Sequence, residues 1–343
     1  MLYEMKQEHY NEPIDIVLPW VDGSDPVWLE EKRNYAIAAG KVDVSSNIAS
    51  RWRDWDNLQY IFRGIEKFMP WVRTVHFVTV GHLPAWLNTE AEHLHIVRHT
   101  DFIPESYLPT FNSNTIELNI HRIPGLAEHF INFNDDMFVI GVTQPEDFFS
   151  PSGLPRDMAV LSPAPVFREV MCNVEVNNLG IINEYFSIED VKKNRSKWCS
   201  TLYGKMVLRT MIFSHFHTIL GIFEQHIPFS YNKSTFEEVW KKEGPFLDTI
   251  CRNKFRTRDD VNEWLMRQWQ IMSGSFEPRR KNFGQLFDLS DDNTEALKDL
   301  QNPGKLRLVC LNDTPAVTDF ERVKEEINTA LDKLLPEKSS FEL

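Results

Sequence analysis

Two adjacent carboxylates close an apolar run of the chain, and their types and spacing suggest chemistry. Residues 130–133 predict a buried strand, and Asp135 and Asp136 follow it directly after Asn134. Two carboxylates at such a strand tip cost free energy unless a cation or a set of donors compensates them. Mg²⁺ or Mn²⁺ binds carboxylate oxygens and bridges a diphosphate, so the pair indicates a metal and phosphate site. The alternative is a strand-to-turn boundary with no ligand.

A second strand end with turn-forming residues lies near the amino terminus. Residues 14–18 predict a strand, and the turn after it consists of Trp20, Val21, Asp22 and Gly23. Asp25 can cap a helix that begins at Pro26, and a helix amino terminus offers unpaired N–H groups to a uracil edge or a diphosphate. An ordinary Asp-Gly turn with a helix cap is the alternative.

Two polar clusters follow along the chain. Arg53 and Asp54 form either a surface ion pair or, through the arginine, a bidentate phosphate contact. The second cluster opens and lines a predicted helix that starts near Asn112 or Ser113; its polar residues are Asn112, Asn114, Glu117, His121 and Arg122. Amide and carboxylate side chains of this kind bind sugar hydroxyls, whereas a solvated helix face and a structural histidine are the alternative.

Two residues in the second half have types suited to proton transfer and phosphate binding. Pro228 holds the chain extended after His226, which can present its imidazole as a general base. Arg256 precedes a helix that Asp259 can cap, a suitable position for a phosphate clamp. Taken alone, each is more typical of a structural residue.

The elements that position these residues alternate between strand and helix in the first half. Strands are predicted at 75–80 and 94–97, and an amphipathic helix at 55–69. This alternation predicts an α/β fold with a mostly parallel, helix-covered sheet. Further along, we expect helices at 203–223 and 259–273, a short helix after Ser234, a strand at 305–311, and a last helix from Thr318 to before Pro336.

Composition restricts the classes of function. The 343-residue chain carries a net charge of -13, which argues against a nonspecific nucleic-acid binder. Its four cysteines form no C-x-x-C pair, so we expect free thiols in a reducing compartment. Residues 207–223 are apolar but contain Arg209 and two histidines, which makes them a poor membrane span. With no signal-peptide pattern at the start, these features predict a cytoplasmic protein that meets the inner face of the membrane through its acceptor or partners.

Taken in order, these blocks resemble the Stealth family of sugar-phosphate transferases over roughly residues 13–275. The first block is the strand and turn from Ile14 to Asp25, and the second runs from Arg51 to Asp136. The looser third and fourth blocks surround His226 and residues 256–260. Two residues depart from the family pattern: Asp22 stands where we expect Asn, and Pro19 where a small hydroxyl residue is common.

The resemblance implies a reaction and a set of roles. The expected reaction transfers a sugar 1-phosphate from a UDP-sugar to a hydroxyl of an acceptor oligosaccharide, free or lipid-linked, releasing UMP and requiring a divalent metal. By position, Asp15 and the turn at residues 20–23 bind the nucleotide, and Asp135 and Asp136 bind the metal and diphosphate. Glu117, His121 and Arg122 lie by the donor sugar, and His226 and Arg256 complete the reaction centre.

The resemblance also implies an architecture, a nucleotide-sugar-transferase (GT-A-like) core with a helical part after it. We expect a catalytic domain at 13–285, divided into an α/β part (13–150) and a helical part (151–285), and an α/β extension at 286–343. His226, or else Asp136, is the expected general base. A metal-dependent glycosyltransferase with the same donor and a noncatalytic sugar- or nucleotide-binding subunit are the alternatives.

Overall fold

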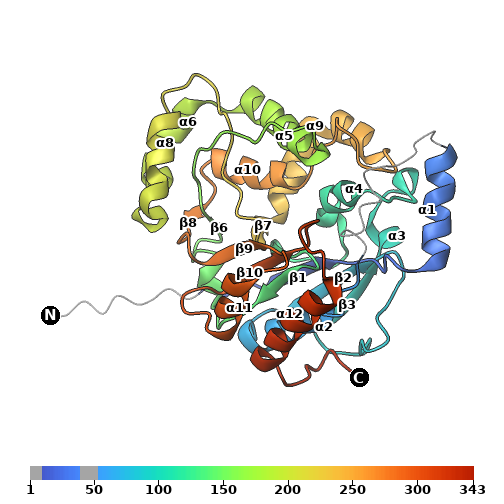
Figure 1. The fold of residues 1–343 in the computed structure, drawn as a ribbon. Coiled ribbons are helices and arrows are strands. Elements are labelled where there is room, and N and C mark those ends of the chain that lie inside the picture. The colour runs from blue at the N-terminus through green and yellow to red at the C-terminus, as the bar shows by residue number, and fades with distance from the viewer. Residues whose placement is uncertain (1–9, 39–52) are drawn as a thin grey trace.

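A five-stranded sheet forms the centre of the molecule (Figure 1). The computed structural model describes residues 10–38 and 53–343, so Arg51, where the second block of the resemblance begins, lies outside it. The strand order is β3-β2-β1-β4-β7; the first four strands are parallel and β7 is antiparallel to β4. The bounds are β1 Ile14–Pro19, β2 Thr74–Thr79, β3 Leu94–Arg98, β4 His129–Asn132 and β7 Phe229–Asn232. The predicted α/β class with a mostly parallel sheet is therefore confirmed.

Helices of the first half follow from apolar spacing and from capping residues. In α2, the side chains of Ile61, Ile65 and Phe68 recur at helical spacing and are buried. The carboxylate of Asp25 accepts a hydrogen bond from Trp28 N at 2.7 Å, so the predicted cap at the start of α1 is confirmed. The bounds are α1 Pro26–Ala38, α2 Leu58–Phe68, α3 His99–Phe102 and α4 Ser113–Leu118.

A second sheet joins the segment that follows β4 to the carboxyl-terminal part of the chain. Its order is β5-β10-β9, with bounds β5 Met137–Val139, β9 Gly284–Asp288 and β10 Leu308–Asn312. The predicted strand at 305–311 is thus confirmed as β10, which is antiparallel to β5 and parallel to β9. The expected boundary at 285/286 falls inside β9, because the last part of the chain completes a sheet that the first part begins.

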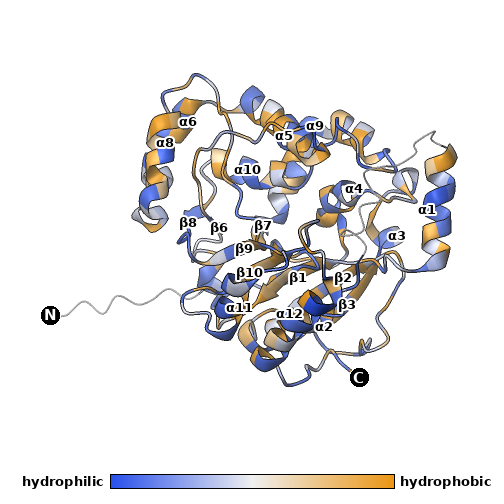
Figure 2. Ribbon diagram, viewed as in Figure 1, coloured by the Kyte–Doolittle hydropathy of each residue, from blue (hydrophilic) through white to orange (hydrophobic). Residues whose placement is uncertain are grey.

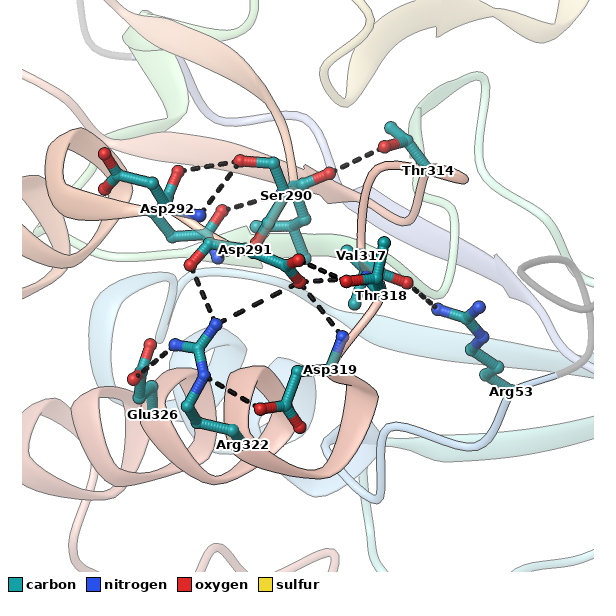
Figure 3. A network of polar contacts seen from close by, with 12 residues as sticks. Arg53, Ser290, Asp291, Asp292, Thr314, Val317, Thr318, Asp319, Arg322 and Glu326 are labelled. Carbon is teal, nitrogen blue, oxygen red and sulfur yellow. Dashed lines mark hydrogen bonds and ion pairs between the residues drawn. The ribbon is translucent and has the colours of Figure 1, made fainter.

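Polar contacts fasten the carboxyl-terminal segment to itself and to the first half (Figure 3). Asp291 accepts hydrogen bonds from Thr318 and from Asp319 N, and Arg322 forms ion pairs with Asp319 and Glu326. Arg322 and Glu326 lie on α12 Phe320–Leu334, which confirms the predicted last helix, and Asp291 lies just before α11 Thr294–Gln301.

The other half of the molecule is mainly helical and lies over one end of the sheets (Figure 1). Its helices are α5 Val170–Tyr185, α6 Ile188–Lys193, α7 Arg195–Trp198, α8 Val207–Phe213, α9 Lys233–Cys251 and α10 Trp264–Met272. The short strands β6 Arg156–Asp157 and β8 Glu277–Pro278 pair in parallel. None of the helices among residues 10–38 and 53–343 is both long enough and apolar enough to cross a bilayer.

Several helix predictions for this half were wrong. The expected helix at 203–223 ends at Phe213, because Ile222 instead forms a β-bridge with Leu161. The neighbouring Gly221 has φ +154 and lies so close to Ser162 O that a Cβ would be 2.2 Å from it, which excludes a larger residue. The helix expected from residue 259 starts at Trp264, the helix after Ser234 extends to Cys251, and α5 was not predicted.

Candidate active site

The acidic residues after β4 lie at the carboxyl ends of the parallel strands. Phe133 N donates to Val17 O of β1 at 2.9 Å, which holds the start of the turn beside that strand. Asp135 and Asp136 then form the turn into β5, and Asp136 O accepts from Leu311 N of β10 at 2.9 Å. The predicted acidic turn therefore lies where ligands bind in open α/β sheets.

One carboxylate oxygen of the acidic turn has no compensating donor among the residues that the structure describes. Desolvation by the surrounding protein, and then the charge of Asp136, raise the pKa of Asp135 to about 7, although its side chain reaches solvent. The Oδ1 atom of Asp136 is buried and has no hydrogen-bond partner among the described residues. Such an orphaned oxygen is the kind of atom that a bound cation or donor satisfies.

The structure brings His226 to the acidic turn. Ligand atoms of Asp136, His226 and Cys310 all lie within 4.8 Å of one another. His226 has φ +49, a strained value for a side-chain-bearing residue, and its N–H donates to Glu224 Oε1 at 3.1 Å. The imidazole thus stands beside a carboxylate that is 90 positions away in the sequence, an arrangement suited to a general base.

Cys310 was not predicted as a site residue. It enters because β10 lies next to β5, a pairing between distant segments that no local pattern indicates. Burial, and then the nearby Asp136, raise the pKa of its thiol well above the usual value. The thiol therefore stays protonated and is a poor metal ligand, which leaves oxygen ligands as the main donors here.

Arg256 and the amides at the start of α4 form a second group. The guanidinium of Arg256 donates to Ser113 Oγ. Asp260 accepts from the side-chain amides of Asn112 and Asn114, at 2.8 and 3.1 Å. The predicted residues Asn112, Asn114 and Arg256 are therefore together, held by Asp260, which the sequence indicated only as part of the fourth block.

The segment that follows Arg256 connects this group to His226. Glu263 lies beside Glu117, and desolvation followed by this like charge raises the pKa of Glu263 well above its ordinary value. The Trp264 ring contacts the His226 ring edge to face, with centroids 5.9 Å apart. Residues 256–264 therefore carry contacts from α4 to the general-base candidate, and Glu263 and Trp264 were missed because nothing in their local sequence distinguishes them from helix residues.

A buried ion-pair network around Arg267 holds Glu224, the residue that contacts the backbone of His226. Arg267 donates to both carboxylate oxygens of Asp157, at 2.8 and 2.9 Å, and to Glu224 Oε2 at 2.9 Å. Since Glu224 also accepts from His226 N, the arginine indirectly fixes the backbone of the histidine. We regard Arg267 and Glu224 as positioning residues.

His121 and Arg122 pack against α9. His121 is buried, with its ring stacked on Phe236, and desolvation followed by the charge of Arg122 lowers its pKa to about 3. A neutral imidazole in an aromatic setting fits a structural role better than the predicted catalytic one. Arg122 is exposed, with its guanidinium 4.6 Å from the centre of the Trp240 ring.

The turn after β1 lies at the same sheet edge as the acidic turn. Trp20 stacks on Phe77 with ring centroids 5.7 Å apart, and Val21 and Gly23 are half-buried. Asp22 accepts from Ser24 N at 2.8 Å, and its own N–H donates to an imidazole nitrogen of His82. This position is compatible with the predicted nucleotide contact.

Three predicted site residues form contacts away from the candidate active site. Asp15 lies at the amino end of β1, the opposite edge of the sheet, where it binds Arg73 and His76. Arg53 donates to Val317 O at 3.0 Å (Figure 3). It also pairs with Asp313, and Asp54 accepts from Asp56 N. These contacts explain all three as residues that stabilise the fold, so the structure does not support their assignment to the nucleotide.

Comparison with known proteins identifies close relatives. The model of Stealth protein CR1, conserved region 1, matches residues 12–38, and that of Stealth protein CR2, conserved region 2, matches residues 51–157. The "Receptor polysaccharide phosphotransferase WefC" of Streptococcus gordonii is 40% identical over 97% of this chain and 99% of its own. The "Capsular polysaccharide phosphotransferase WcwK" of Streptococcus pneumoniae is 39% identical, covering 96% and 99%.

A more distant relative and one solved structure complete the comparison. The "Exopolysaccharide phosphotransferase cps2G" of Lactiplantibacillus plantarum is 34% identical over 96% of each chain. A crystal structure of galactosyltransferase LgtC aligns with a TM-score of 0.36 and 10% identity over 92% of this chain and 95% of that one, too low to carry an argument. The family models and the near-full-length identities confirm the resemblance noted in the sequence: the chain belongs to the Stealth family of phosphotransferases.

Proposed function

We propose that this enzyme transfers a sugar 1-phosphate from a UDP-sugar to a hydroxyl of an acceptor glycan in capsular or exopolysaccharide synthesis. The acceptor oxygen attacks the β-phosphorus, the phosphoanhydride bond breaks, and UMP leaves with the bond's electron pair. The product is a phosphodiester. The observation that supports the proposal is the closeness of Asp136 and His226, whose ligand atoms lie within 4.8 Å of each other, a carboxylate beside an imidazole.

The residues of the acidic turn fit a hard divalent cation. The orphaned Oδ1 of Asp136 and the exposed carboxylate of Asp135 are oxygen donors of the kind that Mg²⁺ or Mn²⁺ prefers. A cation held there would neutralise charge on the diphosphate and on the leaving UMP. The two carboxylates would then both stay ionised, because the cation removes their mutual repulsion.

The protein's own groups supply proton transfer and orientation. His226 accepts the proton of the acceptor hydroxyl as the oxygen attacks, and Glu224 and Trp264 hold the histidine in place. Arg256, whose guanidinium contacts Ser113 at the start of α4, binds phosphate oxygens, and Asn112 and Asn114 orient the donor sugar. The turn at residues 20–23 contacts the nucleotide at the neighbouring strand end.

Product analysis tests this reaction directly. The purified enzyme is incubated with a panel of UDP-sugars, Mg²⁺ and short capsule-type oligosaccharides, free and lipid-linked. We expect UMP release and a phosphodiester signal in the phosphorus NMR spectrum of the product. Release of UDP with no phosphorus in the product would instead show a glycosyltransferase. Donor binding without turnover for any acceptor would indicate a binding subunit.

A paired substitution tests the phosphate clamp. Arg256→Ala should lower the rate of UMP release about a few hundredfold, the usual effect of losing one charged contact to a transferring phosphoryl group. Arg258→Ala is the matched control, because this exposed arginine lies two residues away. Near-normal turnover in the Arg256 variant would remove this residue from the site.

A further inference from the structure

Helix α8 has two apolar faces, and only one of them is covered. On the inner side Thr210 is buried, and Met206 and Val207 pack against Met158, Val160 and Tyr203. The outer side exposes four large apolar side chains: Leu208 (58%), Met211 (45%), Ile212 (61%) and Phe216 (49%). Their spacing places them on one face of the helix and on the turn that follows it. The helix lies at the outer edge of the helical half, and apolar stretches show along it (Figures 1 and 2).

The segment around α8 has a charge opposite to that of the whole protein. Residues 191–223 contain six Lys or Arg side chains and no Asp or Glu, in a chain with a net charge of -13. Lys192 and Lys193 pair with acidic residues of α6. Arg195, Lys205 and Arg209 form no ion pair with any carboxylate that the structure describes, so their charges remain available for an anionic partner.

A recess extends this apolar surface into the protein. It has a volume of about 530 Å³ and lies between α8 and the α6–α7 segment. Its lining includes the apolar side chains of Ile188, Val191, Trp198, Met211 and Phe216, together with the basic Lys192 and Arg195. Apolar walls with basic side chains beside them suit an acyl chain and an anionic headgroup.

We propose that the outer face of α8, with the basic residues around it, docks the enzyme onto a membrane that contains anionic lipids. Exposed apolar side chains on a short helix insert at the boundary between headgroups and acyl chains, and each basic residue near an anionic surface strengthens the binding electrostatically. A second copy of the chain fits less well, because a two-fold interface would place this basic surface against itself. The inference deepens the proposed function, because a lipid-linked acceptor would be presented at this membrane surface.

Vesicle binding tests the docking surface without any substrate. The full chain is sedimented with vesicles of phosphatidylcholine alone and with vesicles that also contain phosphatidylglycerol. We expect binding to the anionic vesicles that weakens with added salt, and little binding to the neutral ones. Leu208→Glu with Ile212→Glu should weaken the binding about tenfold or more, and Lys205→Glu with Arg209→Glu should abolish the preference for anionic lipid.

A control pair of substitutions separates the effect of the position on the surface from the effect of the added negative charge. Ile37→Glu with Val142→Glu replaces residues of similar exposure, 68% and 60%, on other parts of the surface. This pair should bind vesicles as the wild type does. Equal binding by the α8 pair and the control pair, no binding by the wild type, or a dimer that the α8 pair converts to a monomer would each overturn the proposal. UMP release with a soluble acceptor should be the same in the α8 pair and the wild type, so a failure of docking is distinguishable from a failure of the proposed reaction.

Discussion

Aspartates lie at both ends of the parallel strands of the central sheet, and the protein surrounds the two groups with different partners. At the amino edge, Asp15 accepts from Arg73 Nε at 2.8 Å, His76 Nε2 at 3.0 Å and Ala127 N at 2.8 Å. Desolvation raises the pKa of Asp15, but the hydrogen bonds from His76, Arg73 and Ala127 outweigh it, so the net shift is downward. At the carboxyl edge, the pKa of Asp135 is raised to about 7 and one oxygen of Asp136 has no partner among the described residues.

This difference separates a structural carboxylate from a functional one. A carboxylate whose donors all come from the protein needs no ligand, and its contribution is to stability. A carboxylate whose compensation is missing destabilises the free protein and gains that compensation when a ligand binds. Both kinds belong to strands that were predicted from the sequence, so only the surrounding donors distinguish them.

The largest effect is expected at the carboxyl edge. Asp136→Asn should raise the activation barrier by about 3–4 kcal/mol, because one charged contact to the metal and diphosphate is lost. The rate of UMP release should then fall a few hundredfold. Its unfolding free energy, measured by denaturant titration without metal, should stay the same or rise, because one of two like charges is removed. Asp299→Asn, on α11, is the control for both measurements. A loss of activity that merely follows a loss of stability would contradict the distinction between the two edges.

The opposite result is expected at the amino edge. Asp15→Asn should lower the unfolding free energy by about 2–3 kcal/mol, less than for a fully buried pair because Arg73 is 43% exposed. Activity per folded molecule should stay within about threefold of the wild type, since no site residue is touched. An Asp15→Asn variant that is as stable as the wild type but inactive would support the original assignment of Asp15 to the nucleotide site.

The stability that Asp15 contributes also has a defined dependence on pH. Its pKa is lowered in the folded protein from 3.8, so the contribution is fully present above pH 3.8 and is lost as the pH falls through the folded value. The gap in unfolding free energy between the wild type and Asp15→Asn should therefore be constant at neutral pH and close on acidification. A gap that widens in acid would contradict this sign.

The sequence was informative where local pattern determines structure. Apolar runs and caps predicted the parallel strands and helices of the first half, and the acidic turn after β4 was found from its apolar flank alone. Asp15 was misplaced for a physical reason: a strand pattern does not tell which end of the strand faces a ligand, and Arg73 and His76 come from a different strand and its approach. Tertiary partners, which the sequence does not display, decided its role.

The helical half shows where pattern reasoning fails. The sequence of α8 and of the chain after it is typical of one long helix. In the structure the chain after Phe213 is not helical, and Ile222 pairs with Leu161 in a β-bridge. His226 and Arg256 were named from short motifs, whereas the contacts that connect them, through Asp260, Glu263 and Trp264, depend on how α10 packs. Cys310 and the completion of the second sheet by β10 required a pairing across most of the chain.

A buried carboxylate in the helical half extends the comparison, and here the smallest effect is expected. Glu175 on α5 is 9% exposed, and desolvation followed by the charge of Glu224 raises its pKa to about 7. Because the folded value lies above the unfolded 4.5, ionising Glu175 costs stability as the pH rises from 4.5 to 7, and the cost is constant above that. Glu175→Gln should therefore exceed the wild type in unfolding free energy by about 1–2 kcal/mol at pH 8, with the gap closing toward pH 4.5.

The activity of the same variant decides what a raised pKa means in this protein. Glu184→Gln, on the exposed side of α5, should show no such pH-dependent gap. If Glu175→Gln is more stable at pH 8 and releases UMP at the wild-type rate, then a raised pKa alone does not mark a functional carboxylate here. The criterion that remains is the combination found only at Asp136 among these four acids, an oxygen without a partner beside the imidazole of His226. If activity is lost instead, the site extends to α5, and Glu175 belongs with the functional carboxylates.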